Sequence, residues 1–319
     1  MTTFKEIRGN LIKSTSTDPA NPQEGQIWYN STSQVLKGEE ILGAWSAGGN
    51  LGTPRSGLAG AGTQDLGLAF GGNGGTTATE EYDGSAWTAG GSLSQARLSA
   101  VGCGTQTAGL TFGGNAPPVT AATEEYNGTS WTSGGPLNTA RGYLAGAGIQ
   151  TAGLAFGGDE APGKAGLTEE YDGSSWTAGG TMGTARSTFA GAGVQTSALG
   201  FGGYISAPTP TTGATEEYDG SSWTAGGTMG TARYAPAGAG ASSSSALAFG
   251  GGNPGNLAVT EEYNGTAWTE VNDLSTARKR SGGFGIQTSA VACGGTITGT
   301  TAATEEYNYT PVTRTFTTS

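Results

Sequence analysis

Short apolar runs separated by glycine-rich and polar turns recur along the chain every 42 to 47 residues. One copy reads "ARGYLAGAGIQTAGLAFGGDEAPGKAGLTEEYDGSSWTAGGTMGT". The runs do not follow the period of a helix, and they predict four short strands, at 144–150, 152–158, 167–173 and 174–180. Four strands in a repeat of this length are typical of one β-propeller blade.

Three kinds of residue mark the same positions from copy to copy. An arginine opens each of six copies: Arg55, Arg97, Arg141, Arg186, Arg233 and Arg278. A tyrosine ends each Thr-Glu-Glu-Tyr: Tyr82, Tyr126, Tyr171, Tyr218, Tyr263 and Tyr307. Tryptophans recur at the same interval: Trp45, Trp87, Trp131, Trp176, Trp223 and Trp268. The repeats therefore predict an all-β, six-bladed propeller, with blades at about 55–91, 97–135, 141–180, 186–227, 233–269 and 278–308.

The sixth copy ends without a tryptophan strand, whereas the first tryptophan strand has no copy of its own. Residues 42–55 read "LGAWSAGGNLGTPR", which matches "GSSWTAGGTMGTAR" in later copies. An open ring would leave two strand edges unpaired and prone to aggregation. We therefore predict that residues 42–50 form the outer strand of the sixth blade. The propeller domain would then span residues 41–308, followed by a tail at 309–319.

The order of these features resembles the kelch repeat. Gly-Gly follows the second strand, tyrosine lies on the third, tryptophan follows at a fixed distance, and arginine precedes the next copy. The resemblance covers residues 41–308, although the copies are richer in glycine and alanine than common kelch sequences. It implies a scaffold rather than a particular reaction.

Glycine has three expected uses in this scaffold. The Asp-Gly or Asn-Gly between the third and fourth strands predicts a two-residue type I′ turn, with positive φ at both residues. The Gly-Gly pairs predict sharp exits from the second strands, with unusual φ. The Gly- and Ala-rich first strands are expected to converge on the axis, where only small side chains fit.

Length differences between copies are concentrated in the loop between Gly-Gly and Thr-Glu-Glu-Tyr, which has 6 to 11 residues. This loop opens on the same face as the connection that carries the arginine, and repeat proteins commonly vary their binding face. The candidate ligand-binding residues are the six arginines together with Tyr204, Asp159, Glu160 and Lys164. A ring of guanidinium groups would bind an anion such as an acidic glycan. In the alternative interpretation, each arginine pairs with a glutamate and fixes blade to blade.

Composition argues against several functions. The net charge is −11, so no basic face is available for nucleic acid. Histidine is absent, which removes most zinc sites and Ser-His-Asp triads, and near-identical copies offer no unequal pair of carboxylates for glycoside hydrolysis. We therefore expect no metal or cofactor, no enzymatic activity and no membrane insertion. Cys103 and Cys293 are expected to be small buried apolar residues.

The first forty residues lie outside the repeat. "QIWYNSTSQVLKG" predicts two strands joined by a Ser-Thr-Ser turn, so residues 1–40 are expected to form a short hairpin module. The segment "DPANPQEGQIWYNSTSQVLKG" resembles sequences near the start of tail-fibre and other appendage proteins of bacteriophages, particularly marine ones. That resemblance implies a virion structural protein that assembles in the host cytoplasm and has no signal peptide.

Under this hypothesis the N-terminal segment docks on other virion proteins, and the propeller binds a host-surface glycan or receptor. Self-association into a homo-oligomer is compatible with it. A cellular kelch-type scaffold for protein–protein interaction is the alternative, and a glycan-active enzyme is a third class.

Overall fold

The computed structural model describes residues 12–20, 26–73, 76–115, 118–160, 163–205 and 211–316. The regular elements in these ranges are all β-strands, and the ranges contain no helix with the length and apolar character needed to cross a membrane. The chain divides into two compact units. One is Trp45–Asn308, and the other is formed by the described residues of Met1–Ala44 and Tyr309–Ser319.

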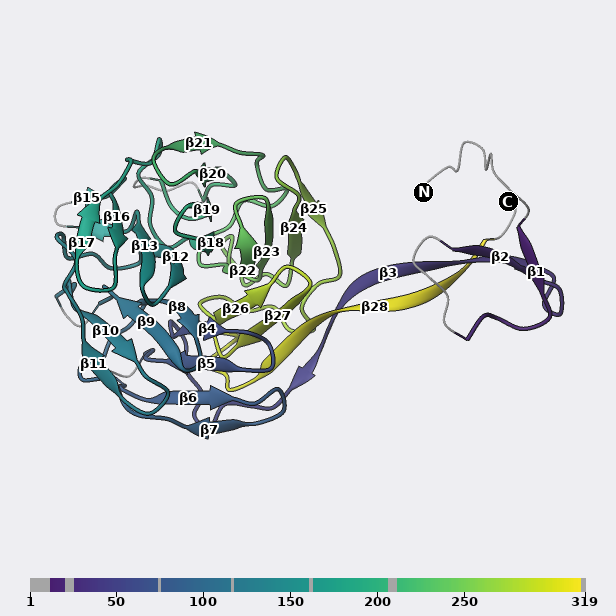
Figure 1. Ribbon diagram of the computed structural model, residues 1–319, viewed down its shortest axis with the longest axis horizontal. Coiled ribbons are helices and arrows are strands. Elements are labelled where there is room, and N and C mark those ends of the chain that lie inside the picture. The colour runs from purple at the N-terminus through teal and green to yellow at the C-terminus, as the bar shows by residue number, and fades with distance from the viewer. Residues whose placement is uncertain are drawn as a thin grey trace. The chain divides into compact units, whose positions relative to one another are not determined.

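Five four-stranded antiparallel sheets of Trp45–Asn308 have the propeller-like arrangement seen in Figure 1. The first contains β4 (Ala59–Gly62), β5 (Gly67–Phe70), β6 (Thr79–Tyr82) and β7 (Trp87–Ala89). The second contains β8 (Val101–Thr105), β9 (Ala108–Phe112), β10 (Thr123–Tyr126) and β11 (Trp131–Ser133). The third contains β12 (Ala145–Ile149), β13 (Ala152–Phe156), β16 (Thr168–Tyr171) and β17 (Trp176–Ala178). The fourth contains β18 (Ala190–Val194), β19 (Ser197–Phe201), β20 (Thr215–Tyr218) and β21 (Trp223–Ala225). The fifth contains β22 (Ala237–Ser242), β23 (Ser245–Phe249), β24 (Thr260–Tyr263) and β25 (Trp268–Glu270). A two-stranded sheet of β14 (Asp159–Glu160) and β15 (Gly163–Lys164) lies in a loop of the third copy.

The strands of the sixth copy belong to a larger sheet, whose order is β1-β2-β3-β28-β27-β26. These strands are β1 (Lys13–Thr15), β2 (Ile27–Asn30), β3 (Val35–Gly48), β26 (Gly282–Ile286), β27 (Ser289–Cys293) and β28 (Thr304–Phe316). The described residues therefore contain five separate four-stranded sheets and not the six that the repeats predict. β3 and β28 each contribute residues to both compact units.

Burial follows the position of a strand within its sheet. In the third sheet β12 alternates buried and half-buried residues, β13 is buried over its last four residues, and in β17 only Trp176 is buried. Leu154 and Phe156 of β13 share a buried cluster with Phe189 and Tyr218 of the next copy. The hydrophobic core therefore lies between neighbouring sheets. Burial of one such large apolar side chain contributes roughly 1.5–3 kcal/mol.

Packing between neighbouring inner strands explains the glycines of the first strands. A Cβ atom on Gly191 of β18 would lie 2.6 Å from the carbonyl oxygen of Gly146 in β12 and 2.7 Å from Cζ of Phe156. The glycines at the same position of the other copies also meet a neighbouring copy: Gly60, Gly102, Gly146, Gly238 and Gly283. Glycine is needed at these positions because the inner strands of adjacent sheets lie in close contact. The sequence prediction had given a different reason, which was crowding of side chains on the axis.

The Asp-Gly turns differ from the predicted two-residue type. β16 and β17 are joined by a four-residue loop, 172–175. Gly173 has a φ of 91°, but Asp172 is not among the residues with positive φ. Asp172 Oδ1 instead accepts hydrogen bonds from the backbone N–H groups of Ser174 and Ser175, both at 2.8 Å. The aspartate is therefore used for its side-chain acceptor, as in an Asx turn.

The prediction for the Gly-Gly pairs is confirmed. Gly157 and Gly158 follow β13 with φ angles of 62° and 100°, and the pairs of the other five copies also have positive φ. A residue with a Cβ atom pays roughly 1–2 kcal/mol in left-handed backbone. Glycine at both positions removes that cost.

The hairpin predicted in the N-terminal segment is confirmed. β2 pairs antiparallel with β3, and Asn30 lies opposite Val35. β1, which the sequence did not predict, pairs with β2 in parallel. The residues expected to form a tail, 309–319, are strand as far as Phe316, and 317–319 lie outside the described residues.

Trp28, which lies outside the repeats, is fully buried in the N-terminal unit. Its Nε1 donates a hydrogen bond to Asp18 Oδ1 at 3.0 Å, and Asn30 Nδ2 donates to the same oxygen at 2.7 Å. Lys37 Nζ donates to the other carboxylate oxygen at 2.6 Å. The hydrogen bonds from Lys37, Asn30 and Trp28 lower the pKa of Asp18 to about 2. One carboxylate from "DPANP" therefore joins three positions of the hairpin.

Candidate functional site

Each of the six arginines is buried and bound within its own copy. Arg141 is typical, because its Nη1 donates to the carbonyl oxygens of Gly157 and Leu167 at 3.0 and 2.8 Å. Its Nη2 donates to Glu169 Oε1 at 2.8 Å. Burial lowers the pKa of Arg141, and the charge of Glu169 opposes that effect. The other arginines pair with the first glutamate of Thr-Glu-Glu-Tyr in the same way: Arg55–Glu80, Arg97–Glu124, Arg186–Glu216, Arg233–Glu261 and Arg278–Glu305.

The main chain of the same arginines contacts the neighbouring copy. The carbonyl oxygen of Arg141 accepts a hydrogen bond from Gly114 N at 2.9 Å, and that of Arg55 accepts one from Gly295 N at 2.7 Å. The other four arginines bond to a Gly-Gly pair likewise. All six arginine side chains are at most 2% exposed. The pairing interpretation therefore holds in every copy, and none of the six guanidinium groups is displayed to a ligand in solvent.

The repeated tyrosines and tryptophans also join neighbouring copies. Tyr171 OH donates to Glu125 Oε1 at 2.5 Å, and Trp176 Nε1 donates to Thr123 Oγ1 at 3.0 Å. The equivalent tyrosine bonds are Tyr82–Glu306, Tyr126–Glu81, Tyr218–Glu170, Tyr263–Glu217 and Tyr307–Glu262. The equivalent tryptophan bonds are Trp45–Thr260, Trp87–Thr304, Trp131–Thr79, Trp223–Thr168 and Trp268–Thr215. The polar atoms of these aromatic residues are therefore occupied by the scaffold.

A ring of residues that the sequence did not reveal lies two positions after each arginine. It consists of Gly57, Ser99, Tyr143, Thr188, Ala235 and Arg280, which all have φ between 49° and 64°. Left-handed backbone is uncommon for residues with a Cβ atom and is often found at functional sites. These six residues line a cavity of about 130 Å³. We call it the mouth cavity.

Main-chain hydrogen bonds between copies hold this ring. Thr188 N donates to the carbonyl oxygen of Tyr143, and Ala235 N donates to that of Thr188, both at 2.8 Å. The same bond runs from Ser99 to Gly57, from Gly57 to Arg280 and from Arg280 to Ala235. These bonds offset the cost of the left-handed backbone. Because they use main-chain atoms only, the side chains of the ring can differ, and they do.

Two tyrosines and two cations from the fourth, fifth and sixth copies lie close together, and one of the cations lines the mouth cavity. The rings of Tyr204 and Tyr234 are stacked, with centroids 4.5 Å apart and an interplanar angle of 18°. Lys279 Nζ donates to Tyr234 OH at 2.7 Å. The next residue, Arg280, is exposed and lines the cavity. We call Tyr204, Tyr234, Lys279 and Arg280 the rim cluster.

Positive charge dominates the rim cluster. Burial acts to raise the pKa of Tyr234. The hydrogen bond and the charge of Lys279 act in the opposite direction, as do smaller effects of Tyr204 and Arg280. Together they outweigh burial, so the pKa of Tyr234 is lowered. Burial and the neighbouring Tyr234 raise the pKa of Tyr204 to about 12. The cluster therefore presents cationic N–H donors beside two hydroxyl groups, which is the chemistry that binds an anion.

The charged loop of the third copy lies beside the fourth copy. Asp159 pairs with Lys164 across the β14–β15 sheet, and Lys164 Nζ lies 3.5 Å from Asp159 Oδ1. Lys164 also donates to Ser187 Oγ at 3.2 Å, and Ser187 forms a β-bridge with Tyr204. Glu160 is half-buried in β14. The structure thus brings Lys164 and Tyr204 to the same serine, with Asp159 neutralising the lysine.

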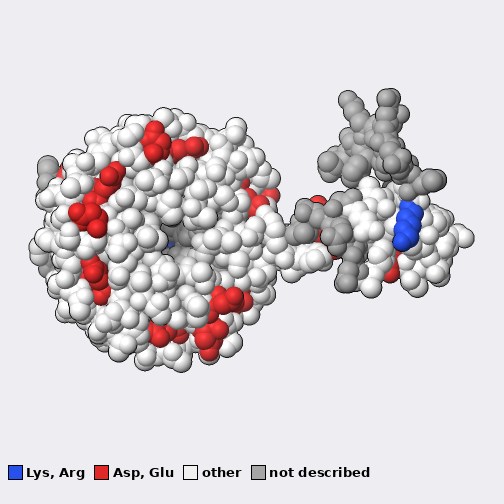
Figure 2. All heavy atoms as spheres, viewed as in Figure 1, with Lys and Arg blue, Asp and Glu red and all other residues white. Residues whose placement is uncertain are grey.

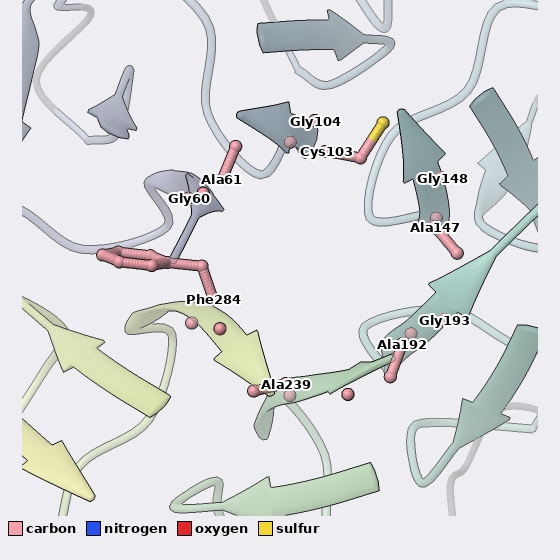
Figure 3. Close-up of a pocket in the computed structure, with 18 residues that line it drawn as sticks. Gly60, Ala61, Cys103, Gly104, Ala147, Gly148, Ala192, Gly193, Ala239 and Phe284 are labelled. Carbon is pink, nitrogen blue, oxygen red and sulfur yellow. The ribbon is translucent and has the colours of Figure 1, made fainter. Parts of the chain in front are cut away.

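A second cavity, of about 150 Å³, lies on the axis and is enclosed by the inner strands (Figure 3). Glycine and alanine form its wall, with Cys103 and Phe284 at two of the alanine positions. Burial raises the pKa of Cys103 and of Cys293 to about 12, so both thiols are unreactive at neutral pH. Both cysteines are buried as predicted. The wall of the axial cavity carries no charged side chain, so we place the candidate site at the mouth cavity.

Acidic side chains are spread over the surface of Trp45–Asn308. In Figure 2 they form separate groups around the central opening. Among the residues that the structure describes, no three Cys, Asp or Glu side chains come together as metal ligands would.

The fold defines an all-β protein with a propeller-like arrangement of small sheets. No protein-family model and no curated protein matches the chain. Among solved structures, the chain is similar to the structure of YjhT, with a TM-score of 0.68 and 15% sequence identity. The match covers 82% of this chain and 99% of that one. At this identity the likeness shows the fold alone.

Proposed function

We propose that this protein is a non-enzymatic structural or appendage protein of a bacteriophage particle, and that its propeller binds a host-surface glycan or receptor. The proposal rests on the positions at which the sequences of the copies differ. The arginine, tyrosine and tryptophan contacts recur in all six copies, whereas the loops after Gly-Gly and the ring of the mouth cavity vary. Variable residues on a rigid scaffold are typical of a binding face.

We further propose that the fold is a closed, six-bladed, kelch-like propeller with residues 42–50 as the outer strand of the sixth blade. Trp45 Nε1 donates to Thr260 Oγ1 at 3.0 Å, which is the bond that every other repeat tryptophan makes. Tyr82 OH donates to Glu306 of the sixth copy, as the other tyrosines do to their neighbours. Both contacts support a ring in which no sheet edge is left unpaired.

The N-terminal segment is proposed to attach the protein to other virion proteins. The resemblance of "DPANPQEGQIWYNSTSQVLKG" to phage appendage proteins supports this role. The contacts of Asp18 with Trp28, Asn30 and Lys37 support a segment with its own defined structure. The virion would then be the site of action.

An activity on glycans is a weaker candidate than binding. Hydrolysis of a glycosidic bond uses two carboxyl groups on either side of that bond. Neither the rim cluster nor the wall of the mouth cavity contains a carboxylate among the described residues. The absence of a carboxylate and the presence of two cations in the rim cluster therefore favour glycan binding over glycan hydrolysis.

Two measurements test the proposal. Mass spectrometry of purified virions should detect the chain, and its absence there would favour the cellular scaffold instead. A glycan array with the full chain should show binding that is lost when loop 204–214 is shortened to the six residues of the first copy. A matched control changes Thr151→Ala in a turn at the other end of the sheets. If the shortened loop leaves binding intact and Thr151→Ala abolishes it, the binding site lies at the other end of the sheets and the proposed face is wrong.

A further inference from the structure

Within Trp45–Asn308, two neighbouring cations have no carboxylate partner among the residues that the structure describes. The unit contains nine lysines and arginines, and six of them are the buried arginines of the Arg–Glu pairs. Lys164 is paired with Asp159. Lys279 and Arg280 remain, and no described carboxylate lies within 4.0 Å of either cationic group.

This pair of charges is unexpected in so acidic a unit. Trp45–Asn308 holds 20 of the chain's 25 acidic residues, and all 20 are among the described residues. Many acidic residues of the same unit could have paired with Lys279 and Arg280, yet none of the described ones does. Two neighbouring cations without a carboxylate create a local positive potential that attracts an anionic ligand.

The rim cluster also orders one of the two cations, Lys279. Tyr234 is held by the stacked ring of Tyr204 and by a hydrogen bond from its OH to the carbonyl oxygen of Pro254 at 3.3 Å. Lys279 is fixed in turn by its hydrogen bond to Tyr234 OH. An ammonium group has three N–H donors, so two remain for a ligand, beside the five of the Arg280 guanidinium.

The mouth cavity beside these cations is small and polar. Its wall includes the hydroxyl-bearing residues Ser99, Thr188 and Ser281, and Ser281 Oγ is buried without a hydrogen-bond partner among the described residues. About 130 Å³ is the volume of roughly four liquid water molecules. A cavity of this size accepts one end of a polar ligand and not a folded segment of protein.

We propose that the rim cluster binds the anionic group of a saccharide through Lys279 and Arg280, and that the mouth cavity receives one polar edge of the sugar that carries it. This inference rests on the proposed binding function and names the ligand class. The anionic group is a carboxylate, a sulfate or a phosphate ester, which all accept charge-assisted hydrogen bonds from ammonium and guanidinium groups.

The repeats supply a variant that removes the charge and keeps the fold. In the second copy, Leu98 and Ser99 occupy the positions of Lys279 and Arg280, and Ser99 adopts the same left-handed backbone. The double variant Lys279→Leu/Arg280→Ser therefore gives the sixth copy a sequence that the scaffold already accommodates. Arg314→Ala is the matched control, because it removes an exposed cation that already has a partner, Glu40, and that lies outside the unit with the candidate site.

The experiment is titration calorimetry of the full chain at low and high salt, with four probes: a uronate oligosaccharide, a sulfated oligosaccharide, a neutral oligosaccharide and inorganic phosphate. We expect at least one anionic oligosaccharide to bind, with weaker binding at high salt. Lys279→Leu/Arg280→Ser should weaken it about tenfold or more, since a hydrogen bond to a charged group is of that strength. Arg314→Ala should change it by less than about threefold. Thermal melting followed by circular dichroism checks that both variants fold. Arg280→Lys keeps the positive charge and should therefore retain part of the affinity.

Each other outcome has a distinct meaning. Anionic binding that the double variant leaves unchanged overturns the inference but leaves the proposed function intact. The same holds if only the neutral oligosaccharide binds. Inorganic phosphate that binds as tightly as the oligosaccharides shows that the anion alone is recognised, which overturns the saccharide part. If neither the four probes nor the glycan array shows binding, the proposed function fails together with the inference.

Discussion

Truncation of Trp45 tests whether the strand at 42–50 closes the ring. The Trp45 ring lies 4.9 Å from that of Phe249 and 5.1 Å from that of Tyr307, measured between centroids. Its Nε1 donates to Thr260. Aromatic pairs contribute about 0.5–1.5 kcal/mol each, and a hydrogen bond contributes about as much. Because Trp45 is half-buried, Trp45→Ala should lower the free energy of unfolding by about 3 kcal/mol, the low end of the range for a fully buried aromatic side chain.

Trp223→Ala is the matched control. Trp223 lies in a four-stranded sheet and makes the same contacts, with Phe156 at 4.8 Å, Tyr218 at 5.0 Å and Thr168 at 2.8 Å. Urea unfolding followed by far-ultraviolet circular dichroism measures both losses. If Trp45 belongs to the sixth blade, the two losses are equal within about 1 kcal/mol.

The closure model is refuted if Trp45→Ala costs less than about 0.5 kcal/mol, as a surface substitution would, while Trp223→Ala costs its full amount. Two truncations give an independent test. Deleting residues 1–38 should leave the melting temperature of the propeller unchanged, whereas deleting 1–50 should lower it. Equal melting temperatures would contradict the model.

Three further predictions concern single groups. Arg141→Met should cost about 3–5 kcal/mol of stability in urea unfolding because it leaves Glu169 buried without its partner, and adding Glu169→Met should recover part of that loss; additive losses would show that the pair is not coupled. Asp18 has a folded pKa of about 2, below its ordinary value of 3.8, so its stabilising effect is complete above about pH 4 and is lost as the pH falls toward 2. The indole N–H resonance of Trp28 should shift in that window, and Asp18→Asn should abolish the dependence, whereas a shift centred at pH 6 would assign it to another group. Cys103 and Cys293 should react with a thiol reagent only on unfolding, and rapid labelling of the native chain would contradict their burial.

The sequence predicted features that recur from copy to copy. Positive φ at Gly-Gly and the pairing of arginine with glutamate recur in all six copies, and four strands form a separate sheet in five of them. These features depend on local spacing, so each copy is a separate observation of the same pattern. The hairpin of β2 and β3 was predicted for a different reason. Its strands are adjacent in sequence, and a polar turn lies between them.

The sequence did not predict the ring of the mouth cavity or the rim cluster. Tyr143 and Arg280 have left-handed backbone, but neither residue type signals that conformation. The only available signal was that their position varies from copy to copy. Tyr204, Tyr234 and Lys279 come from three copies, so their contact depends on how the sheets pack.

Two errors came from local signals with more than one structural outcome. Asp-Gly is compatible with a two-residue turn and with the four-residue loop that β16 and β17 use, because aspartate can accept hydrogen bonds from the backbone. The end of the chain was assigned as a tail because it lacks the repeat. It is nevertheless part of β28, and Arg314 Nε lies 2.9 Å from Glu40 Oε2 of β3. A strand that pairs with a segment about 270 residues away leaves no local pattern.

The proposed function requires a ligand to bind at the mouth cavity, on the face that carries the variable loops. Amide hydrogen exchange of the full chain, with and without the glycan selected on the array, locates the bound ligand. We predict slower exchange at the N–H groups of Thr188, Ala235 and Arg280 and in the loops beside them. Slower exchange confined to the turns at the other end of the sheets, such as 172–175, would contradict it.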